Sequence, residues 1–203
     1  MNKPFSQACE NNKQPILEVI EVIFENKHHI LEIGSGTGQH AVYFSQMLPH
    51  LHWHTSDKKQ NHDGINIWTT EYPSRNLHKP INLDVSQRNH WNTLGDQKIC
   101  FDGIFTANTL HIMSWDDVIA MFEALAILLS SQADFVIYGP FNRNGLFTSE
   151  SNQKFDHSLK SCNEHMGIRN DVDVFELAEN NEFIFLQGYE MPANNRILVF
   201  KKL

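Results

Sequence analysis

Cysteine is scarce in this sequence, and the few cysteines present are not arranged for cross-linking. The chain of 203 residues contains three, Cys9, Cys100 and Cys162, and no CxxC pair. An odd number of widely separated cysteines argues against a disulfide framework and against a zinc–cysteine site. A reducing compartment suits such a chain, and we expect the cytoplasm.

Long apolar runs and clusters of positive charge are also missing. The longest apolar stretch, 118–129, is interrupted by Glu123 and is too short to cross a bilayer. The start of the chain, 1–6, lacks the apolar core of a signal peptide. Lys and Arg number 16 against 24 Asp and Glu, which gives a formal net charge of −8. We expect no membrane partner and no nucleic-acid partner, since phosphate backbones require clustered Lys and Arg.

What the sequence does contain is an alternation of short apolar runs with helix-length segments. Strands are predicted at 29–33, 51–56, 80–83, 101–107, 135–138, 183–186 and 197–200, and helices at 15–24, 39–47, 114–129 and 172–179. This alternation predicts an α/β, Rossmann-like fold with a seven-stranded, mostly parallel sheet and helices on both faces. The last two strands are too close in sequence for a parallel crossover, so an antiparallel hairpin is predicted at the C-terminal end.

No repeat, low-complexity tract or linker divides the chain, so residues 1–203 are predicted to form one domain. Within it, residues 1–14 are expected to form a cap segment at the ligand edge of the sheet. Residues 141–170 are polar and long for a strand-to-helix connection. Such insertions are usually functional or mobile, and we expect this one to act as a lid that excludes water.

A glycine-rich turn follows the first predicted strand. It consists of Gly34, Ser35, Gly36, Thr37 and Gly38. In open parallel sheets, ligands bind beyond the carboxyl ends of the strands, at the point where the strand order reverses. Glycines there remove side chains that would block a ligand lying against the backbone. Asp57, at the end of the second strand, stands where a ribose-binding carboxylate is expected, so the pattern predicts a nucleotide-type ligand.

Two ligands compete for this loop, a dinucleotide and S-adenosylmethionine (SAM). In the dinucleotide fingerprint G-x-G-x-x-G the third glycine would fall at Gln39, whereas here it comes one residue earlier, at Gly38. Glu32 precedes the first glycine by two residues and would repel a pyrophosphate, while it would attract the sulfonium and ammonium groups of SAM. The loop therefore favours SAM over a dinucleotide.

Two further polar residues follow predicted strands. Asp84 comes after the third strand and could accept a hydrogen bond from the adenine amino group, or it could simply cap a turn. Asn108 ends the fourth strand and would lie under the methionine part of SAM, although a turn role is equally consistent with asparagine.

These motifs resemble the class I SAM-dependent methyltransferases from about residue 15 to the end of the chain. The segments 108–115, 138–142, 148–152 and 191–195 are similar to a small family catalogued as a domain of unknown function, whose animal members are called methyltransferase-like 26. The segment 10–17 fits as well, except that Asn11 stands where an arginine is expected. The resemblance implies SAM binding and methyl transfer, with S-adenosylhomocysteine (SAH) as product, and it identifies no acceptor.

The predicted topology brings several segments together above the glycine loop. His111 is the best candidate for a general base, although it could instead cap or pack against the following helix. Candidates to orient the acceptor are Asn142, Asn194 and Asn195, the last two of which could be ordinary turn residues. The acceptor side is expected to include Asn12, Lys13 and Tyr138 as well.

The residues after the fourth strand also bear on the acceptor. Methyltransferases that act on nucleobase amino groups commonly carry an Asn/Asp-Pro-Pro-aromatic run there, whereas this chain has Asn108, Thr109, Leu110 and His111. We therefore expect a small-molecule acceptor, with a protein acceptor left open. Two rival functions remain, a non-catalytic SAM-binding protein on the same fold and a dinucleotide-dependent oxidoreductase. The sequence does not predict an oligomeric state.

Histidines alternate at His50, His52 and His54, which places all three on one face of the second strand. No cysteine or carboxylate joins them locally. Because adjacent histidines on one face of a strand rarely converge on an ion, we expect a structural cluster and no metal.

Overall fold

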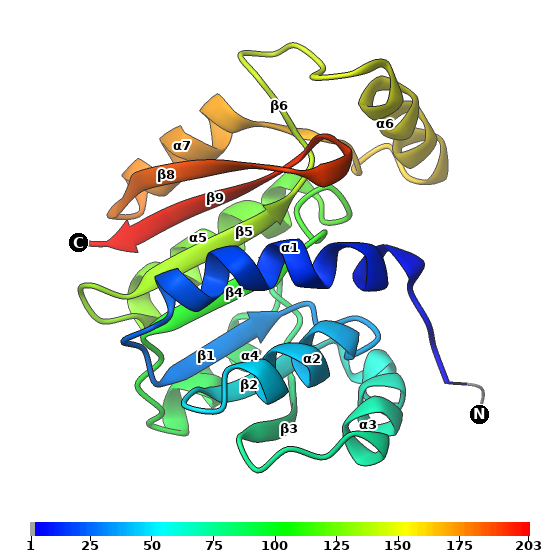
Figure 1. Ribbon diagram of the computed structural model, residues 1–203. Coiled ribbons are helices and arrows are strands. Elements are labelled where there is room, and N and C mark those ends of the chain that lie inside the picture. Colours follow the sequence, from blue (N-terminus) through cyan, green and yellow to red (C-terminus); the bar gives the residue numbers. More distant parts are fainter. Residues whose placement is uncertain (1–2) are drawn as a thin grey trace.

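The computed structural model describes residues 3–203, so Met1 and Asn2 of the predicted 1–14 cap segment lie outside the described residues. A seven-stranded sheet runs through the molecule in the order β3-β2-β1-β4-β5-β9-β8 (Figure 1). Its strands are β1 (His29–Ile33), β2 (His52–Asp57), β3 (Leu77–Asn82), β4 (Gly103–Ala107), β5 (Asp134–Gly139), β8 (Phe183–Met191) and β9 (Asn195–Lys202). β1 to β5 are parallel, and β9 runs antiparallel to both β5 and β8. The predicted Rossmann-like fold class is confirmed, including the C-terminal hairpin.

Helices cover both faces of this sheet. They are α1 (Gln7–Ile23), α2 (Gln39–Met47), α3 (His62–Glu71), α4 (Arg88–Asp96), α5 (Trp115–Leu128), α6 (Glu150–Cys162) and α7 (Asp171–Asn180), with short 3-10 turns η1 (Lys59–Asn61) and η2 (Pro192–Asn194). α1, α2 and α3 lie on one face, and α4, α5 and α7 lie on the other (Figure 1). None of the helices in residues 3–203 has the length and apolar character needed to cross a membrane.

The core has two layers because the parallel strands are buried on both sides. Ile30 packs with α1 and α2, whereas its neighbours Leu31 and Ile33 pack with α4 and α5. Successive side chains of a strand point to opposite faces, so a continuous apolar strand such as β1 supplies both layers. This two-sided burial fixes the ends of β1 and β4, and with them the loops that follow.

The helices α3, α4 and α6 and parts of several strands were missed by the apolar pattern. α3 buries only His62 and Ile65, and α4 buries only Trp91 and Leu94, so neither carries an apolar stripe long enough to be recognised. β8 is an edge strand with four consecutive exposed residues after Phe183, and it extends to Met191. As a result β8 and β9 are longer than predicted, and only η2 separates them.

The 141–170 segment is more ordered than its polar sequence suggested. It contains α6 and two short strands, β6 (Phe141–Asn142) and β7 (Arg169–Asn170), which pair in parallel as a separate small sheet. The side chain of Ser149 accepts a hydrogen bond from the backbone of Asn152 and so caps α6. α6 stands at the side of the molecule towards which the parallel strands point (Figure 1).

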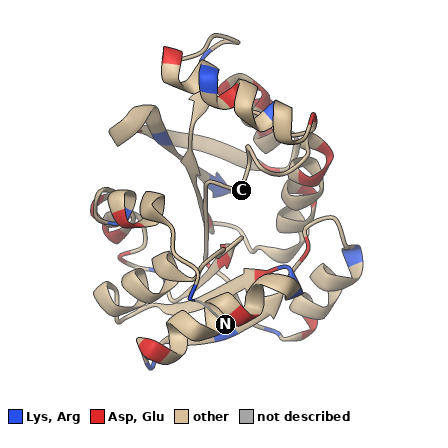
Figure 2. Cartoon of the chain, turned by 90° about the vertical axis from the view of Figure 1, so that its right-hand side faces the viewer, with Lys and Arg blue, Asp and Glu red and all other residues tan. Residues whose placement is uncertain are grey.

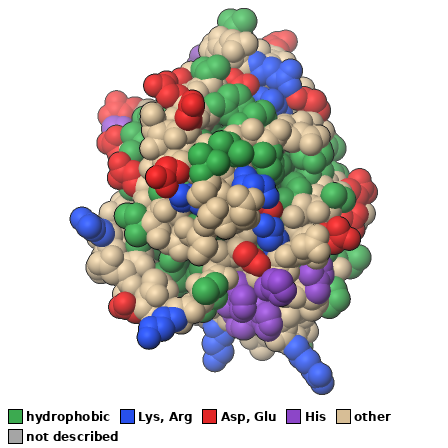
Figure 3. Space-filling model, turned by 90° about the vertical axis from the view of Figure 1, so that its left-hand side faces the viewer, with side chains coloured by type: hydrophobic (Ala, Val, Ile, Leu, Met, Phe, Trp, Pro, Cys, Tyr) green, Lys and Arg blue, Asp and Glu red, His purple; other side chains and the backbone are tan. Residues whose placement is uncertain are grey.

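Four histidines from three neighbouring strands meet near the amino ends of the parallel strands. His54 and His78 stack with ring centroids 4.0 Å apart, His29 Nδ1 lies 3.1 Å from His54 Nε2, and His52 Nδ1 lies 3.1 Å from His78 Nε2. They form a compact patch on this side of the molecule (Figure 3). His50, in contrast, contacts the carbonyl oxygen of Phe24. Within residues 3–203, no group of three or more His, Cys, Asp or Glu side chains has the arrangement of a metal site.

The stacked imidazoles make the folded state sensitive to acid. Burial, together with the neighbouring His78, His29 and His52, lowers the pKa of His54 to about 3. Burial and the same neighbours also lower the pKa values of His29 and His78. His54 is therefore neutral in the folded protein at pH 5, whereas an unfolded histidine takes up a proton below about pH 6.5. The unfolded state therefore binds more protons, and stability decreases as the pH falls.

We predict that replacing His54 with glutamine makes unfolding less sensitive to acid. A histidine that protonates only on unfolding contributes about 2 kcal/mol of acid destabilisation between pH 6.5 and pH 5. Urea denaturation of His54→Gln at several pH values should therefore show a smaller loss of stability than the parent protein. The matched control is His157→Gln, at an exposed position of α6, whose pH dependence should equal that of the parent. Equal pH dependence in both variants would contradict the prediction.

Candidate cofactor and acceptor site

The turn from β1 into α2 is built from glycines in the left-handed region of the backbone. The φ angles are +73° at Gly34, +57° at Gly36 and +88° at Gly38. A Cβ on Gly34 would lie 2.5 Å from Cγ2 of Thr109, which sits in the loop after β4. The turn therefore lies where the strand order reverses between β1 and β4, as predicted for a ligand-binding loop.

Glu32 supports this turn from inside the sheet. Its side chain is only 2% exposed, and its Oε2 accepts hydrogen bonds from Ser35 Oγ (2.9 Å) and Trp53 Nε1 (3.1 Å). Burial raises the pKa of Glu32 to about 7, against the opposing effect of the two hydrogen bonds, and the charge of Asp57 raises it further. Glu32 is thus poised between its neutral and ionised forms at neutral pH, and a nearby cation would favour the carboxylate.

Asp57 joins the end of β2 to the same turn. Its Oδ2 accepts a hydrogen bond from Gly36 N (2.8 Å), and its Oδ1 accepts from Lys58 N (2.7 Å) and Asn61 Nδ2 (2.8 Å). Asp57 therefore lies directly beside the glycine turn. Asp84, after β3, accepts from Ser86 and forms an ion pair with Lys58 (3.3 Å). Burial acts to raise the pKa of Asp84, but the Ser86 hydrogen bonds and Lys58 outweigh it and lower the pKa overall.

His111 occupies a buried position below α6. Its ring contacts Phe155 edge to face, with centroids 5.3 Å apart, and a Cβ on Gly139 would lie 3.8 Å from its Nδ1. The same Cβ would lie 4.0 Å from Oδ1 of Asn108, whose φ is +58°. Burial lowers the pKa of His111 to about 4, and the charge of Arg169 adds to this effect. His111 is consequently a neutral imidazole at physiological pH, beside the end of β5.

The sequence assigned no role to Arg169, which ties the far end of the 141–170 segment to the loop of His111. Its Nε donates to the carbonyl oxygen of Leu110 (3.0 Å), and its Nη2 donates to those of Met113 and His165. Gly167 N also donates to the carbonyl oxygen of His111 (3.0 Å). No local sequence signal reveals the contacts with Leu110 and Met113, because these backbone partners lie more than fifty residues away in the chain.

The start of α1 is fastened to the glycine turn by Gln39. The Gln39 Oε1 atom accepts from Ser6 N (2.6 Å), and its Nε2 donates to Ser6 O (3.2 Å) and Glu10 Oε1 (2.9 Å). Gln39 is almost fully buried. In the sequence, Gln39 mattered only because it stands where the dinucleotide fingerprint requires its third glycine. In the structure its carboxamide holds the predicted cap segment against the first turn of α2.

Asn12 of α1 lies next to Tyr138 of β5. Asn12 Oδ1 is 2.7 Å from Nε2 of His40, and the Asn12 side chain also hydrogen-bonds the buried Tyr138. Burial lowers the pKa of His40 to about 4, so a neutral ring donates its Nε2 proton to Asn12. Burial raises the pKa of the Tyr138 hydroxyl, so this tyrosine stays protonated. Lys13 points elsewhere, where it pairs with Glu10.

The remaining residues predicted to orient the acceptor, Asn142, Asn194 and Asn195, lie in β6 and in the turn between β8 and β9. Asn142 in β6 donates from Nδ2 to Ile168 O (3.4 Å), while its buried Oδ1 has no hydrogen-bond partner. Asn194 lies in the η2 turn, and its carbonyl oxygen accepts from Asn152 Nδ2 (3.1 Å) at the start of α6. Asn195 donates its side-chain amide back to Pro192 O (3.2 Å) and closes the turn. Asn142 therefore lies in the buried part of the 141–170 segment, whereas Asn194 and Asn195 lie in the turn of the C-terminal hairpin.

Charge on this side of the molecule is mixed. Figure 2 looks along the sheet from the side to which the parallel strands point, and basic residues are not gathered in one place there. Two cavities are lined by other segments, one by residues between 143 and 196 and one by residues between 5 and 72, and neither includes Gly34 or Gly36.

The strand order and the glycine turn between β1 and α2 are those of the class I SAM-dependent methyltransferase fold. The mitomycin 7-O-methyltransferase MmcR has a TM-score of 0.81 at 14% identity, over 97% of this chain and 54% of that protein. Human N-acetylserotonin methyltransferase in complex with SAM has a TM-score of 0.76 at 12% identity, over 97% and 53%. PigF with SAH has a TM-score of 0.75 at 14% identity, over 97% and 64%.

Residues 3–202 match the family described as "Protein of unknown function (DUF938)". The chain belongs to this family. It spans 53–64% of the length of the three solved structures named above, and the likeness to them is one of fold.

We predict that Gly34→Ala destabilises the protein, because the new Cβ meets Thr109 and because φ at this position is +73°. The left-handed conformation alone costs an alanine about 1–2 kcal/mol. The matched control is Gly95→Ala in α4, where a Cβ meets nothing within 4 Å. That change should be neutral or should stabilise by up to about 1 kcal/mol. Thermal or urea unfolding measures both, and equal stability of the two variants would contradict the prediction.

Proposed function

We propose that this protein is a SAM-dependent methyltransferase acting on a small-molecule acceptor, and that the whole chain works as one domain. The observation that carries the proposal is the left-handed glycine turn between β1 and α2, with Asp57 bonded to Gly36 N and Glu32 bonded to Ser35 Oγ. The closer kinship with methyltransferase-like 26 is part of the same proposal.

The residues around the turn fit SAM. The absence of side chains at Gly34 and Gly36 leaves the backbone open to a ligand, and Asp57 at the end of β2 can accept hydrogen bonds from a ribose. Glu32, with its pKa raised to about 7, carries a charge that a sulfonium or ammonium group would stabilise, whereas a pyrophosphate would repel it. Asp84 would accept from the adenine amino group, and Asn108 would support the methionine part.

When bound, SAM supplies an electrophilic methyl group, which passes to the acceptor atom while the sulfur keeps the bonding electron pair and SAH is formed. The protein has to align the acceptor with the methyl group and remove any proton that the acceptor releases. His111 suits the second task because it is buried and neutral, so it can take up that proton. Tyr138 and Asn12 would orient the acceptor by hydrogen bonds, and Asn142 Oδ1 offers a further acceptor atom that has no partner in the protein.

The acceptor is proposed to be a small molecule because α6 and its flanking strands stand over His111 as a lid. Phe155 covers the imidazole, and Gly167 and Arg169 bind the loop that carries it. Excluding water strengthens the electrostatic interactions of the buried site. Two of the solved structures with the same fold are named for methyl transfer to small molecules, mitomycin and N-acetylserotonin, which supports this choice.

Calorimetric titration tests the cofactor. We predict that SAM and SAH bind and that NAD does not. Asp57→Ala should weaken SAM binding by about tenfold or more, because two ribose hydroxyls lose their acceptor. Asp96→Asn, at the exposed end of α4, serves as the matched control and should bind SAM as the parent does. Tight binding of NAD without a response to SAM would refute the proposal.

The catalytic role of His111 is tested with SAM labelled in the methyl group and a fractionated metabolite extract. Transfer of label to an extract component should fall by about 10²-fold or more in His111→Ala, while SAM affinity stays unchanged. For an acceptor that must lose a proton, the rate should rise with pH through about 4 and level off above it, because only the neutral imidazole accepts a proton. Unchanged transfer by His111→Ala would reject the base role. SAM binding without transfer to any component would favour a non-catalytic SAM-binding protein.

A further inference from the structure

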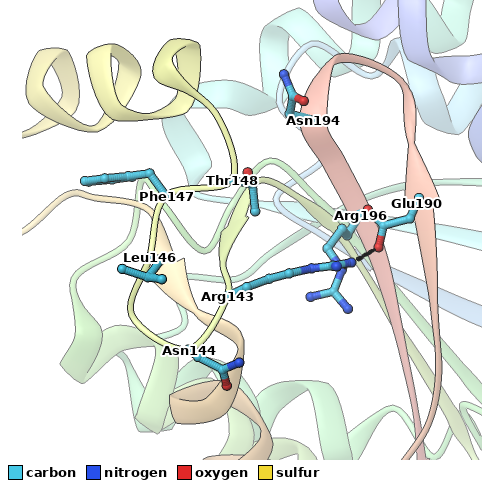
Figure 4. A pocket seen from close by; sticks show the side chains of 8 residues that line it. All are labelled: Arg143, Asn144, Leu146, Phe147, Thr148, Glu190, Asn194 and Arg196. Atoms are coloured by element: carbon cyan, nitrogen blue, oxygen red, sulfur yellow. Dashed lines mark hydrogen bonds and ion pairs between the residues drawn. The ribbon is translucent and has the colours of Figure 1, made fainter.

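A cavity of about 450 Å³ lies between the loop after β6 and the β8–β9 hairpin (Figure 4). Its polar lining includes Arg143 from the loop, Glu190 from β8 and Arg196 from β9, and its apolar lining is Leu146 and Phe147. No residue of the glycine turn and no proposed catalytic residue lines it. Asn194, one of the candidates to orient the acceptor, does line it, but the cavity lies apart from the glycine turn and from His111.

Two guanidinium groups converge on one point of this cavity. The Oε1 atom of Glu190 contacts Arg143 Nη2, and the same atom lies 3.3 Å from Arg196 Nε. The side chains of Arg143 and Glu190 reach toward each other across the cavity from different segments (Figure 4). A position where two guanidinium groups meet one carboxylate oxygen is a position suited to an anion.

Arg196 is held in place independently of Glu190. Its Nη1 lies 2.8 Å from Oδ2 of Asp171, and both side chains of this pair are about 90% buried. Its Nε is also buried and lacks a well-formed hydrogen bond, because the 3.3 Å contact with Glu190 is poorly directed. A buried N–H group without a good acceptor is unfavourable, so an acceptor with better geometry would be bound there.

Glu190 can be displaced by such an acceptor. Its side chain is 69% exposed, whereas Asp171 is fully engaged by Arg196, Asn144 N and Val172 N. An ion pair formed by exposed side chains is worth little, since both groups can be solvated instead. Glu190 offers only one oxygen to the two arginines, while the carboxylate of a ligand can turn so that each arginine receives its own oxygen.

Two large apolar side chains of the cavity lining are exposed to solvent. Leu146 is 72% exposed, Phe147 is 37% exposed, and both line the cavity beside Arg143. Large apolar side chains held next to an anion position can cover the hydrocarbon part of a ligand. We propose that this cavity binds a small amphipathic carboxylate, with its carboxylate group at Arg143 and Arg196 in place of Glu190 and its apolar body on Leu146 and Phe147.

The site has a direct connection to the proposed lid. Thr148 and Asn194, which also line the cavity, both hydrogen-bond the side chain of Asn152 in the first turn of α6. The cavity lining is therefore joined to the start of α6 by two direct hydrogen bonds.

Titration calorimetry with 4-phenylbutyrate tests the proposal on the full chain without SAM, so its failure would leave the proposed methyl transfer untouched. Phenylbutyrate should bind, whereas 4-phenylbutyramide, acetate and inorganic phosphate should bind at least about tenfold more weakly. Arg143→Gln should weaken phenylbutyrate binding by about tenfold or more. Glu190→Gln should strengthen it several-fold, because the internal competitor is removed. Arg75→Gln, at an exposed position before β3, is the matched control and should change nothing.

The opposite effects of the two variants separate this proposal from a structural role of the ion pair. If Arg143 and Glu190 only hold the loop to β8, both substitutions loosen the cavity and both weaken binding. Weaker binding in Glu190→Gln would therefore overturn the proposal, as would equal binding of the amide and the carboxylate. Preference for phosphate over phenylbutyrate would overturn the amphipathic character of the ligand.

Discussion

The turn from β1 into α2 can close only because Gly34 carries no side chain. The backbone there is left-handed, and the methyl group of Thr109 lies only 2.5 Å from where a Cβ would stand. Thr109 in turn hydrogen-bonds the buried Thr106 on β4, whose hydroxyl donates to the backbone of β1. The close approach of the loops after β1 and β4 at the point where strand order reverses thus depends on this one contact.

Carboxylates then hold the turn from two sides. Glu32 reaches it from β1 through the hydroxyl of Ser35, and Asp57 reaches it from β2 through the amide of Gly36. Because Glu32 is buried, its ionised form is destabilised and its pKa rises to about 7. The same burial that makes Glu32 a structural support makes it responsive to a cation. The proposed cofactor role and the folding role of this residue therefore have one physical origin.

Burial also keeps three separate imidazoles neutral. The pKa values of His40 and His111 are lowered to about 4 and that of His54 to about 3, in each case mainly by loss of solvent. His40 uses its neutral ring to hold Asn12, and His54 uses it to stack on His78, so these two are structural. The His111 ring packs edge to face with Phe155, and neither it nor Phe155 is tied to another element by that contact in the way His40 is tied to Asn12, which fits the proposed role of His111 in proton transfer.

Local sequence patterns were enough to predict the strand–helix alternation, the antiparallel C-terminal hairpin, the glycine turn and the position of Asp57. These features depend on local patterns, namely continuous apolar strands buried on both faces and glycines at left-handed positions. α3 and α4 could not be predicted in this way, because each buries only two side chains and has too short an apolar pattern.

Which distant side chains meet depends on how the elements pack in three dimensions. Gln39 fastens the start of α1, Arg169 binds carbonyl groups near His111, and Arg143 converges with Arg196 on Glu190. The four-histidine patch likewise required the register of β1, β2 and β3, which placed His29 and His78 beside His52 and His54 and left His50 out. Such contacts join atoms from separate elements. They cannot be predicted from a pattern along the chain, because they depend on the order and register of the strands in the sheet.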